Sequence, residues 1–327
     1  MKILTVNVGS ESKKYSSFEN DMGIWSVTIE QKDGQLGEEK LNDQFDVIAF
    51  RVVAPGNFFR EHKVIDEEFL TQLESARIKA PLHVERLLSE IKFFRAKFPN
   101  VKMVAISDSA FHFTLPDYVR LYSLPINDTK EFDIEHFGYH GISLSSIVEI
   151  LKSRGLLPEK VIICHLGGGS SITALKNGES IDTSMGFTPL SGLTMATRVG
   201  EIDPGALVYL SEVKNLHGEK FEEYLANQCG FFGFAGTPSM KQLLAQEAMD
   251  EKSALVIKMF VYQVQKYIGA YAVALGGLDL LVFSGGIGEV SEPIRSKILA
   301  GLGALGQNVL VVPTNESAEM VRLAKNL

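Results

Sequence analysis

Residues 161–205 read VIICHLGGGSSITALKNGESIDTSMGFTPLSGLTMATRVGEIDPG, and this stretch decides the fold. An apolar run at 161–166 stops at three glycines, 167–169, and apolar residues then return in alternation over 170–175. The Asn177-Gly178 pair that follows is a strong hairpin signal, so the pattern predicts two joined hairpins. Successive glycines let backbone N–H groups approach an anion, although they would also suit a plain hairpin tip.

The same arrangement of strand and turn occurs twice more. Residues 2–8 form an apolar run, 9–12 a turn of small polar residues, and 13–18 a second run. The apolar run at 280–284 leads into a Gly-rich turn, and Ser291-Glu292-Pro293 then predicts a helix start whose N–H groups suit a phosphate. None of these turns has the Gly-Lys-Ser/Thr of a Walker loop or the GxGxxG spacing, so the cradle is of another type.

The composition is that of a large acidic globular protein. A length of 327 residues favours two domains, and 45% hydrophobic residues allow a sizeable core. The net charge of −8 disfavours nucleic acid or an anionic membrane as a partner, because both need clustered Lys and Arg. Cys164 and Cys229 belong to no CxxC motif and no targeting segment is visible, so we expect a cytoplasmic protein.

Strands and helices alternate along the remaining sequence. Further strands are predicted at 47–51, 101–106 and 308–312. Helices are predicted at 66–79, 82–97, 144–154, 204–213, 220–227, 239–248, 254–277 and 316–325. The segment 254–277 carries Lys258 and Lys266, so we expect a core helix there rather than a membrane span. The alternation indicates the α/β class.

Charged side chains lie where several of these strands end. Arg51 ends one strand, Asp108 follows another, and His165 lies in the strand at 161–166. Because ligands of α/β folds bind where strands end, we expect these three side chains on one rim. His140 and Arg198 also fall at loop junctions, and the five residues together indicate a site for an anion.

Short motifs occur in a fixed order along nearly the whole chain. They lie at 7–15, 51–53, 80–83, 108–112, 138–143, 164–167, 182–190, 197–198 and 313–316. Examples are Gly138-Tyr139-His140-Gly141 and Pro313-Thr314-Asn315-Glu316. In these motifs the chain resembles the acetate kinase family, within the acetate and sugar kinase, Hsp70 and actin superfamily, and looks like a shortened, divergent member.

The resemblance implies a duplicated two-domain actin-like, or ribonuclease H-like, α/β fold with an ATP cleft between the domains. It implies an N-terminal domain of residues 1–109 plus 314–327. The second domain, 110–313, would carry the phosphate hairpin. Members of the family dimerise through the second domain, so a homodimer is expected, with the helix at 254–277 as a contributor.

The resemblance also implies a reaction. The γ-phosphate of ATP would pass reversibly to a short-chain carboxylate, acetate before others, giving an acyl phosphate and ADP. The nucleophile is already ionised at neutral pH, so catalysis is charge neutralisation and in-line positioning. The catalytic residues carried over are Asp108, Arg198, His140, Arg51 and His165. Asn7 and Glu316 are carried over as ligands of Mg²⁺, the expected cofactor.

Substrate-binding positions follow from the same resemblance. The acid would meet Arg51, Val53, Leu82, Tyr139 and Pro189. The nucleotide would meet Ser10, Ser12, Lys14, His165, Gly167, Gly168, Gly169, Gly285, Gly286, Ile287 and Gly288. A pocket bounded by Val and Leu favours acetate or propionate over butyrate. Tyr139 replaces the usual phenylalanine, and its hydroxyl either narrows the pocket or bonds a polar substituent of a hydroxylated acid.

Several departures from the family pattern keep other functions open. Ala54-Pro55-Gly56 replaces His-Gly-Gly, Gly168 replaces an asparagine, Glu11 replaces a serine, and Lys241 is what remains of an Asp/Arg nucleoside contact. These changes suit a catalytically weak nucleotide- or phosphate-binding homologue. They also suit a kinase for another short acid or another phosphoryl donor. An actin-like filament is disfavoured, because nothing suggests an open self-complementary surface.

Overall fold

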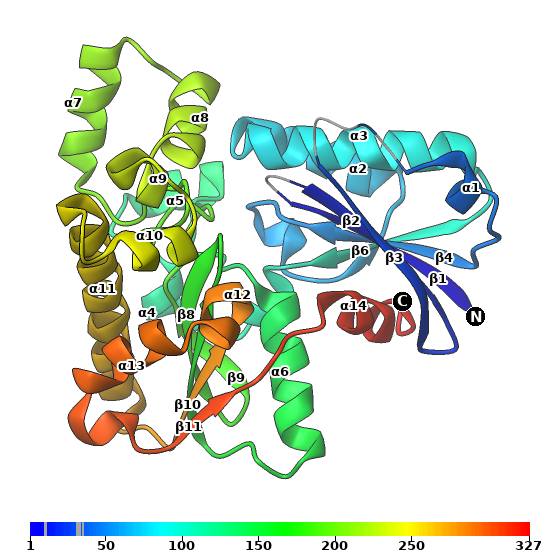
Figure 1. The fold of residues 1–327 in the computed structure, drawn as a ribbon. Coiled ribbons are helices and arrows are strands. Elements are labelled where there is room, and N and C mark those ends of the chain that lie inside the picture. Colours follow the sequence, from blue (N-terminus) through cyan, green and yellow to red (C-terminus); the bar gives the residue numbers. More distant parts are fainter. Residues whose placement is uncertain (10–11, 31–33, 35) are drawn as a thin grey trace. The chain divides into compact units, whose positions relative to one another are not determined.

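The computed structural model describes residues 1–9, 12–30, 34 and 36–327, which fold into two α/β units (Figure 1). The first unit comprises Met1–Phe113, Gly141–Ser146 and Asn315–Leu327. The second comprises Thr114–His140 and Ile147–Thr314. Each unit has its own sheet and its own hydrophobic core.

The first sheet has six strands in the order β3-β2-β1-β4-β6-β5. They are β1 Lys2–Val8, β2 Ser12–Glu19, β3 Met22–Glu30, β4 Val47–Val52, β5 Lys63–Val64 and β6 Lys102–Ser107. Strands β1, β2 and β3 form an antiparallel meander, whereas β1, β4 and β6 run parallel. The parallel pairing brings the carboxyl ends of β4 and β6 to the same edge of the sheet.

The second sheet repeats this topology. Its strands are β7 Lys160–Leu166, β8 Ser170–Lys176, β9 Glu179–Thr183, β10 Leu280–Ser284 and β11 Val309–Val311. Their order is β11-β10-β7-β8-β9, with β7, β8 and β9 as the meander and β7, β10 and β11 parallel. This matches β6-β4-β1-β2-β3 strand for strand, so the predicted duplication and the α/β class are confirmed.

Helices flank both sheets. The first unit contains α1 Glu38–Leu41, α2 Glu67–Ser75, α3 Pro81–Lys97 and α14 Glu316–Ala324. The second contains α4 Asp117–Arg120, α5 Ile126–Phe132, α7 Pro204–Lys214, α8 Glu219–Asn227, α9 Gly230–Ala235, α10 Met240–Gln246, α11 Glu251–Leu275, α12 Gly285–Val290 and α13 Glu292–Ala300. Helix α6, Gly141–Ser153, begins in the first unit and ends in the second. Short 3-10 turns lie at Asn57–Phe59, Ala76–Ile78, Ala110–His112 and Gly303–Gly306.

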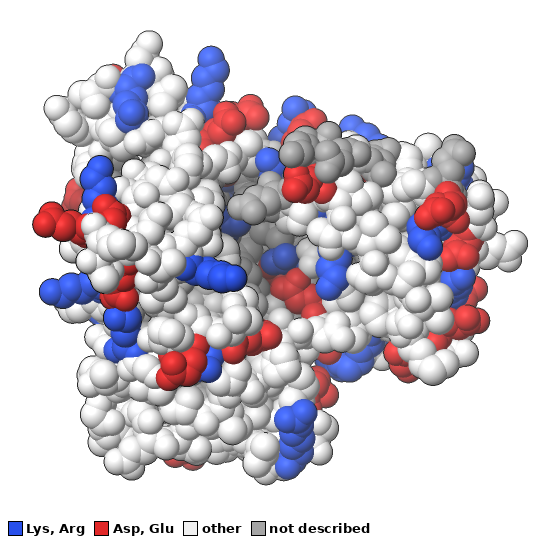
Figure 2. All heavy atoms as spheres, in the orientation of Figure 1, with Lys and Arg blue, Asp and Glu red and all other residues white. Residues whose placement is uncertain are grey.

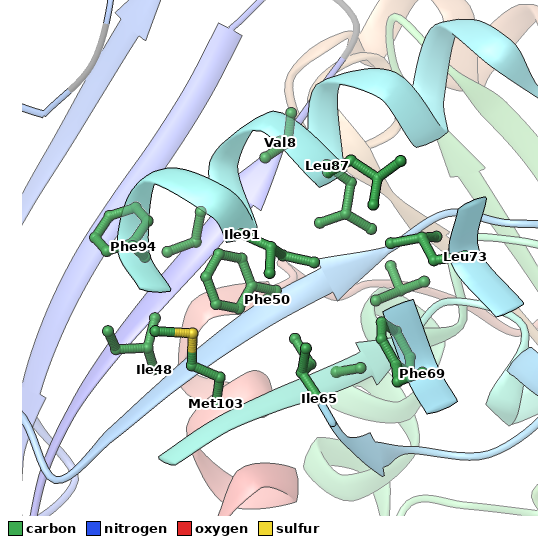
Figure 3. Packing of buried hydrophobic residues seen from close by; sticks show 14 of the residues in the cluster. Val8, Ile48, Phe50, Ile65, Phe69, Leu73, Leu87, Ile91, Phe94 and Met103 are labelled. Atoms are coloured by element: carbon green, nitrogen blue, oxygen red, sulfur yellow. The ribbon is translucent and has the colours of Figure 1, made fainter. Parts of the chain in front are cut away.

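Both faces of the first sheet are covered by helices. Successive side chains of β4 point to opposite faces, as in any strand. Ile48 and Phe50 pack toward α3, where Phe94 meets them (Figure 3). Val47 and Ala49 pack against α14 on the other face. Burial on both faces explains why β4 is a continuous apolar run rather than an alternating one.

The long helix α11 forms the core of the second unit. Its Phe260 and Val264 are buried against Ile162 of β7 and Ile172 of β8. The predicted core helix at 254–277 is therefore confirmed. In the part of the chain that the structure describes, no helix has the length and apolar character needed to cross a bilayer. On the face drawn in Figure 2, the Lys and Arg side chains are interspersed with the Asp and Glu side chains.

Several local predictions were wrong or incomplete, and the short elements β5, α1, α4, α5 and α9 were not predicted. The structure has a strand, β3, that the sequence pattern did not predict, joined to β2 by Asn20 and Asp21, both with positive φ of 48° and 71°. A two-residue turn of this kind usually carries a glycine, and its absence here hid the hairpin. The Gly-rich turn predicted after 280–284 is instead the short helix α12. Its glycine at 285 is explained by packing, because a Cβ there would lie 2.6 Å from the Leu166 carbonyl of β7.

Candidate active site

A buried ion pair lies at the carboxyl edge of the first sheet. Arg51 is near the end of β4, and Asp108 directly follows β6. The Arg51 guanidinium donates to Asp108 Oδ2 through Nη2 at 2.6 Å and Nε at 3.2 Å. The Asp108 side chain is completely buried, so this contact is what compensates its charge. The predicted meeting of these two strand ends is therefore observed.

Asn7 and Glu316 extend this cluster. Asn7 lies in β1, next to β4, and Glu316 begins α14. Asn7 Nδ2 donates to Glu316 Oε2 at 2.7 Å, and Arg51 Nη1 donates to Asn7 Oδ1 at 3.2 Å. Burial alone would lower the pKa of Arg51, but the charges of Asp108 and Glu316 raise it above its usual value. The guanidinium therefore stays charged across the physiological pH range.

Ser143 is a member of this cluster that the sequence analysis did not single out. It lies in the first turn of α6, is fully buried, and donates to Glu316 Oε1 at 2.5 Å. The two carboxylate oxygens of Glu316 are thus held by Ser143 and Asn7. No local pattern could reveal this contact, because Ser143 and Glu316 are 173 residues apart in sequence.

A second polar cluster lies within the second unit. His140 is the N-cap residue of α6 and has a left-handed backbone, with φ of 61°. The ring centroids of His140 and His165 are 4.6 Å apart. His140 Nδ1 lies 2.9 Å from the hydroxyl of Ser171, which is buried in β8. A left-handed non-glycine residue costs energy and is often found at functional sites.

The side chains of His140 and Arg198 both lie close to Gly169. A Cβ at Gly169 would lie 3.1 Å from His140 Nε2 and 3.4 Å from Arg198 Nη1. Arg198 Nη1 also donates to the Pro189 carbonyl at 3.3 Å, which fixes the direction of the side chain. A cation and an imidazole nitrogen therefore lie beside the same glycine, an arrangement suited to an oxyanion.

His165 is not on the rim that was predicted for it. It lies in β7 of the second sheet, whereas Arg51 and Asp108 belong to the first sheet. The rule that ligands bind at strand ends holds within one sheet, and the sequence alone did not show that these strands belong to two sheets. His165 instead stands beside His140.

The predicted pocket residues are divided between the units. Val53 and Leu82 are half-buried in the first unit, while Tyr139 and Pro189 are buried in the second. The Tyr139 hydroxyl donates to the Phe187 carbonyl at 2.6 Å. Its proton is thus used inside the protein, so it is not available to donate to a polar substituent of the acid.

The glycine turns differ in how their N–H groups are used. The Gly285 N–H donates to Glu289 Oε1 at 3.0 Å, and the same oxygen accepts from Thr314 N at 3.3 Å. The predicted cradle of Gly285, Gly286, Ile287 and Gly288 therefore already contains a carboxylate from its own helix. Gly168, between β7 and β8, is exposed, and Gly167 N donates to the Ser170 hydroxyl at 3.1 Å.

The remaining predicted positions lie at the first hairpin. Ser12 begins β2 and is half-buried, and the neighbouring Lys14 is exposed. Ser10 and Glu11 lie outside the described residues. The groups of three or more His, Cys, Asp or Glu that hold many metals do not occur among the described residues. Oxygen donors from Asn7 and Glu316 are the candidates for a hard cation.

Two sheets of one topology, each with cationic side chains near a strand end or an adjoining turn, define an α/β protein of the actin-like class with sites for anions. The chain belongs to the acetokinase family, whose sequence model matches residues 27–321. It is therefore an enzyme of the carboxylate kinase class, and the resemblance drawn from the motifs is confirmed.

Individual relatives are similar over most of their length. The chain is 36% identical to the acetate kinase of Thermoanaerobacter pseudethanolicus, covering 94% of this chain and 88% of the relative. It is 34% identical to the acetate kinase of Caldicellulosiruptor bescii, and the match covers 100% of this chain and 99% of the relative. A propionate kinase structure from Francisella tularensis superimposes with a TM-score of 0.90 at 30% identity, covering 100% and 99%. The acetate kinase structure from Entamoeba histolytica superimposes with a TM-score of 0.85 at 26% sequence identity. The match covers 100% of this chain and 99% of that structure.

The space around Gly169 predicts the effect of adding one methyl group. We expect Gly169→Ala to lower kcat by about tenfold, because His140 Nε2 or Arg198 Nη1 must move by a few tenths of an ångström. The melting temperature should change little. Steady-state kinetics and thermal unfolding would measure both.

Gly269→Ala is the matched control, because a Cβ there meets nothing within 4 Å in α11. Full activity of Gly169→Ala would show that these two side chains do not contact the reacting anion.

Proposed function

We propose that this protein transfers the γ-phosphate of ATP reversibly to a short-chain carboxylate, with acetate as the leading acceptor. The observation that carries the proposal is the convergence of His140 Nε2 and Arg198 Nη1 beside Gly169. Both groups suit the equatorial oxygens of a phosphoryl group in transfer. Membership of the acetokinase family supports the same chemistry.

Charge is the main obstacle in this reaction. An ionised acid and a phosphate repel each other, so the site must supply positive charge and orientation rather than a base. Arg198 supplies that charge in the second unit. Arg51 in the first unit is already paired with Asp108 through Nε and Nη2, so it contributes orientation and hydrogen-bond donors rather than an uncompensated charge. In this proposal Asp108 acts through Arg51, as a residue that positions it.

The identity of the acid rests on the size of the side chains around it. Val53, Leu82, Tyr139 and Pro189 are the proposed contacts, and such residues favour an acyl group of two or three carbons. The similar structure from Francisella tularensis is a propionate kinase, which makes propionate the second candidate. The internal hydrogen bond of Tyr139 argues against a hydroxylated acid.

A binding protein with weak catalysis is the alternative function. The Gly285 N–H already donates to Glu289, and Lys241, the remnant of the nucleoside contact, is an exposed side chain. Both features would weaken binding of ATP without touching the Arg198 cluster. Another phosphoryl donor is compatible with the same observations.

A hydroxylamine trap for acyl phosphate tests the proposal directly. With ATP and Mg²⁺, we expect product from acetate and propionate, less from butyrate, and little from lactate. Arg198→Ala should lower kcat by about 10²-fold or more, since it removes a charge that faces the transition state. No product from any acid, together with ATP binding by calorimetry, would favour the weak homologue. No binding of ATP would point to another donor.

We propose that Asn7 and Glu316 hold Mg²⁺ together with phosphate oxygens and water. Asn7 Nδ2 donates to Glu316 Oε2 at 2.7 Å, so Asn7 Oδ1 and the Glu316 carboxylate belong to one cluster, and Mg²⁺ prefers such oxygen ligands. When bound, the ion would neutralise charge on the phosphates. Ser143 would keep Glu316 oriented toward Asn7.

Glu316→Gln should raise the Mg²⁺ concentration needed for half-maximal activity by about tenfold or more, and EDTA should abolish turnover. Titration of activity with Mg²⁺ measures the shift. Glu319→Gln is the matched control on the same helix, since that carboxylate binds Arg322. An equal shift in both variants would contradict the assignment.

We also propose a homodimer formed through the second unit. Val208 and Tyr209 of α7 and Tyr262 of α11 are 68%, 70% and 66% exposed. Pro204 at the start of α7 and Tyr262 of α11 line one open groove. Large apolar side chains exposed together mark an interface.

Both cysteines are free thiols, which suits a reducing compartment such as the cytoplasm.

Light scattering would test this interface. We expect a dimer for the unaltered protein and a shift toward monomer for Val208→Asp, because a buried unpaired charge opposes association. Ile78→Asp is the control, as Ile78 is 89% exposed in the first unit. A monomeric unaltered protein would refute the proposal.

A further inference from the structure

Ser171 carries a buried hydroxyl beside His140 in the second unit. It lies in β8 with no exposed surface, and in the strand pairing it is directly opposite His165 of β7. Its Oγ is 2.9 Å from Nδ1 of His140. Sequence motifs gave it no role, because its contact with His140 spans 31 residues.

The other nitrogen of His140 lies on the side of the anion. Nε2 is the atom nearest to the space beside Gly169, where Arg198 Nη1 also lies. The contact of Nδ1 with the Ser171 hydroxyl favours this orientation of the ring. Each ring nitrogen therefore has a separate partner.

A neutral imidazole carries one N–H, and the partner of one nitrogen decides where that proton lies. A hydroxyl that donates to Nδ1 leaves the proton on Nε2, which can then donate to an oxyanion. The opposite tautomer would present a lone pair to the negative oxygen, which is repulsive. The position of one hydroxyl hydrogen therefore determines whether His140 helps or opposes the reaction.

We propose that Ser171 is a positioning residue whose hydroxyl donates to His140 Nδ1 and so keeps the ring proton on Nε2, directed at the phosphoryl group. This inference rests on the proposed kinase function. It concerns His140, because the Ser171 hydroxyl lies 2.9 Å from Nδ1 of that ring. Ser171 itself touches no reacting atom.

Nitrogen-15 NMR of histidine-labelled protein reads the tautomer without using activity, since protonated and bare ring nitrogens differ widely in shift. His140→Ala identifies the His140 signals by their absence. We expect Nε2–H in the unaltered protein and in Ser171→Thr, which keeps a hydroxyl. In Ser171→Ala we expect a mixture of tautomers.

Kinetics supply the second readout. Ser171→Ala should lower kcat by about tenfold with little change in the KM for ATP, consistent with loss of one hydrogen bond that orients a catalytic group. In a His140→Ala background the same change should have no further effect, because the residue it positions is gone. Thr173→Val, which removes another buried hydroxyl of β8, should keep full activity.

The inference is overturned by an Nδ1–H tautomer in the unaltered protein, by an unchanged tautomer in Ser171→Ala, or by an equal kinetic loss in the His140→Ala background. Absence of acyl phosphate from the unaltered protein would instead refute the proposed function. The ring-nitrogen spectrum would then still decide the role of Ser171.

Discussion

The first unit depends on how it compensates one buried charge. Asp108 is removed from solvent at the end of β6, and a carboxylate in that position is costly unless a cation meets it. Arg51 on the adjacent strand is that cation, and its Nη1 also donates a hydrogen bond to Asn7 Oδ1. The Asp108 carbonyl also accepts from Gly141 N at 3.1 Å, which ties the start of α6 to the same point. The ion pair and its neighbours thus link the ends of β1, β4 and β6, which are already paired along the sheet, to the start of α6.

The duplication of the sheet explains why a single chain can offer two clusters of this kind. Each copy of the topology ends parallel strands at one edge, and polar side chains at that edge cost the core nothing. The first copy uses its edge for a carboxylate and amide pair, Glu316 and Asn7. In the second, His140 and Arg198 lie beside Gly169 of the turn between β7 and β8. One architecture therefore provides two different chemical environments, one built on a carboxylate and an amide and one on an imidazole and a guanidinium.

The strands could be predicted from the sequence because their apolar runs are long and clearly bounded; β1 agrees residue for residue. The strand β3 could not be predicted, because its hairpin turn lacks glycine. Helix α12 could not be predicted either, because its glycines are required by close contact with β7 rather than by a turn. In the site, Arg51 and Asp108 were predictable because both lie at the end of a strand. The contacts of Ser143 and Ser171 were not, because a hydroxyl carries no pattern that identifies a distant partner. The rule that ligands bind at strand ends placed His165 on the wrong rim, because strand order in a sheet is a long-range property that the local pattern does not show.

Helix α14 both covers one face of the first sheet and carries Glu316, and it is made after the whole second unit. During synthesis on the ribosome, the face of the sheet that carries Val47 and Ala49 is therefore not covered by α14 until about 200 more residues have been added. This takes on the order of 10 to 40 s at ordinary rates of synthesis. During that interval the early sheet presents an apolar surface that only the nascent chain itself or a chaperone can shield. The same delay means that the carboxylate of Glu316 joins Asn7 last, so no partly made chain can carry a complete first cluster.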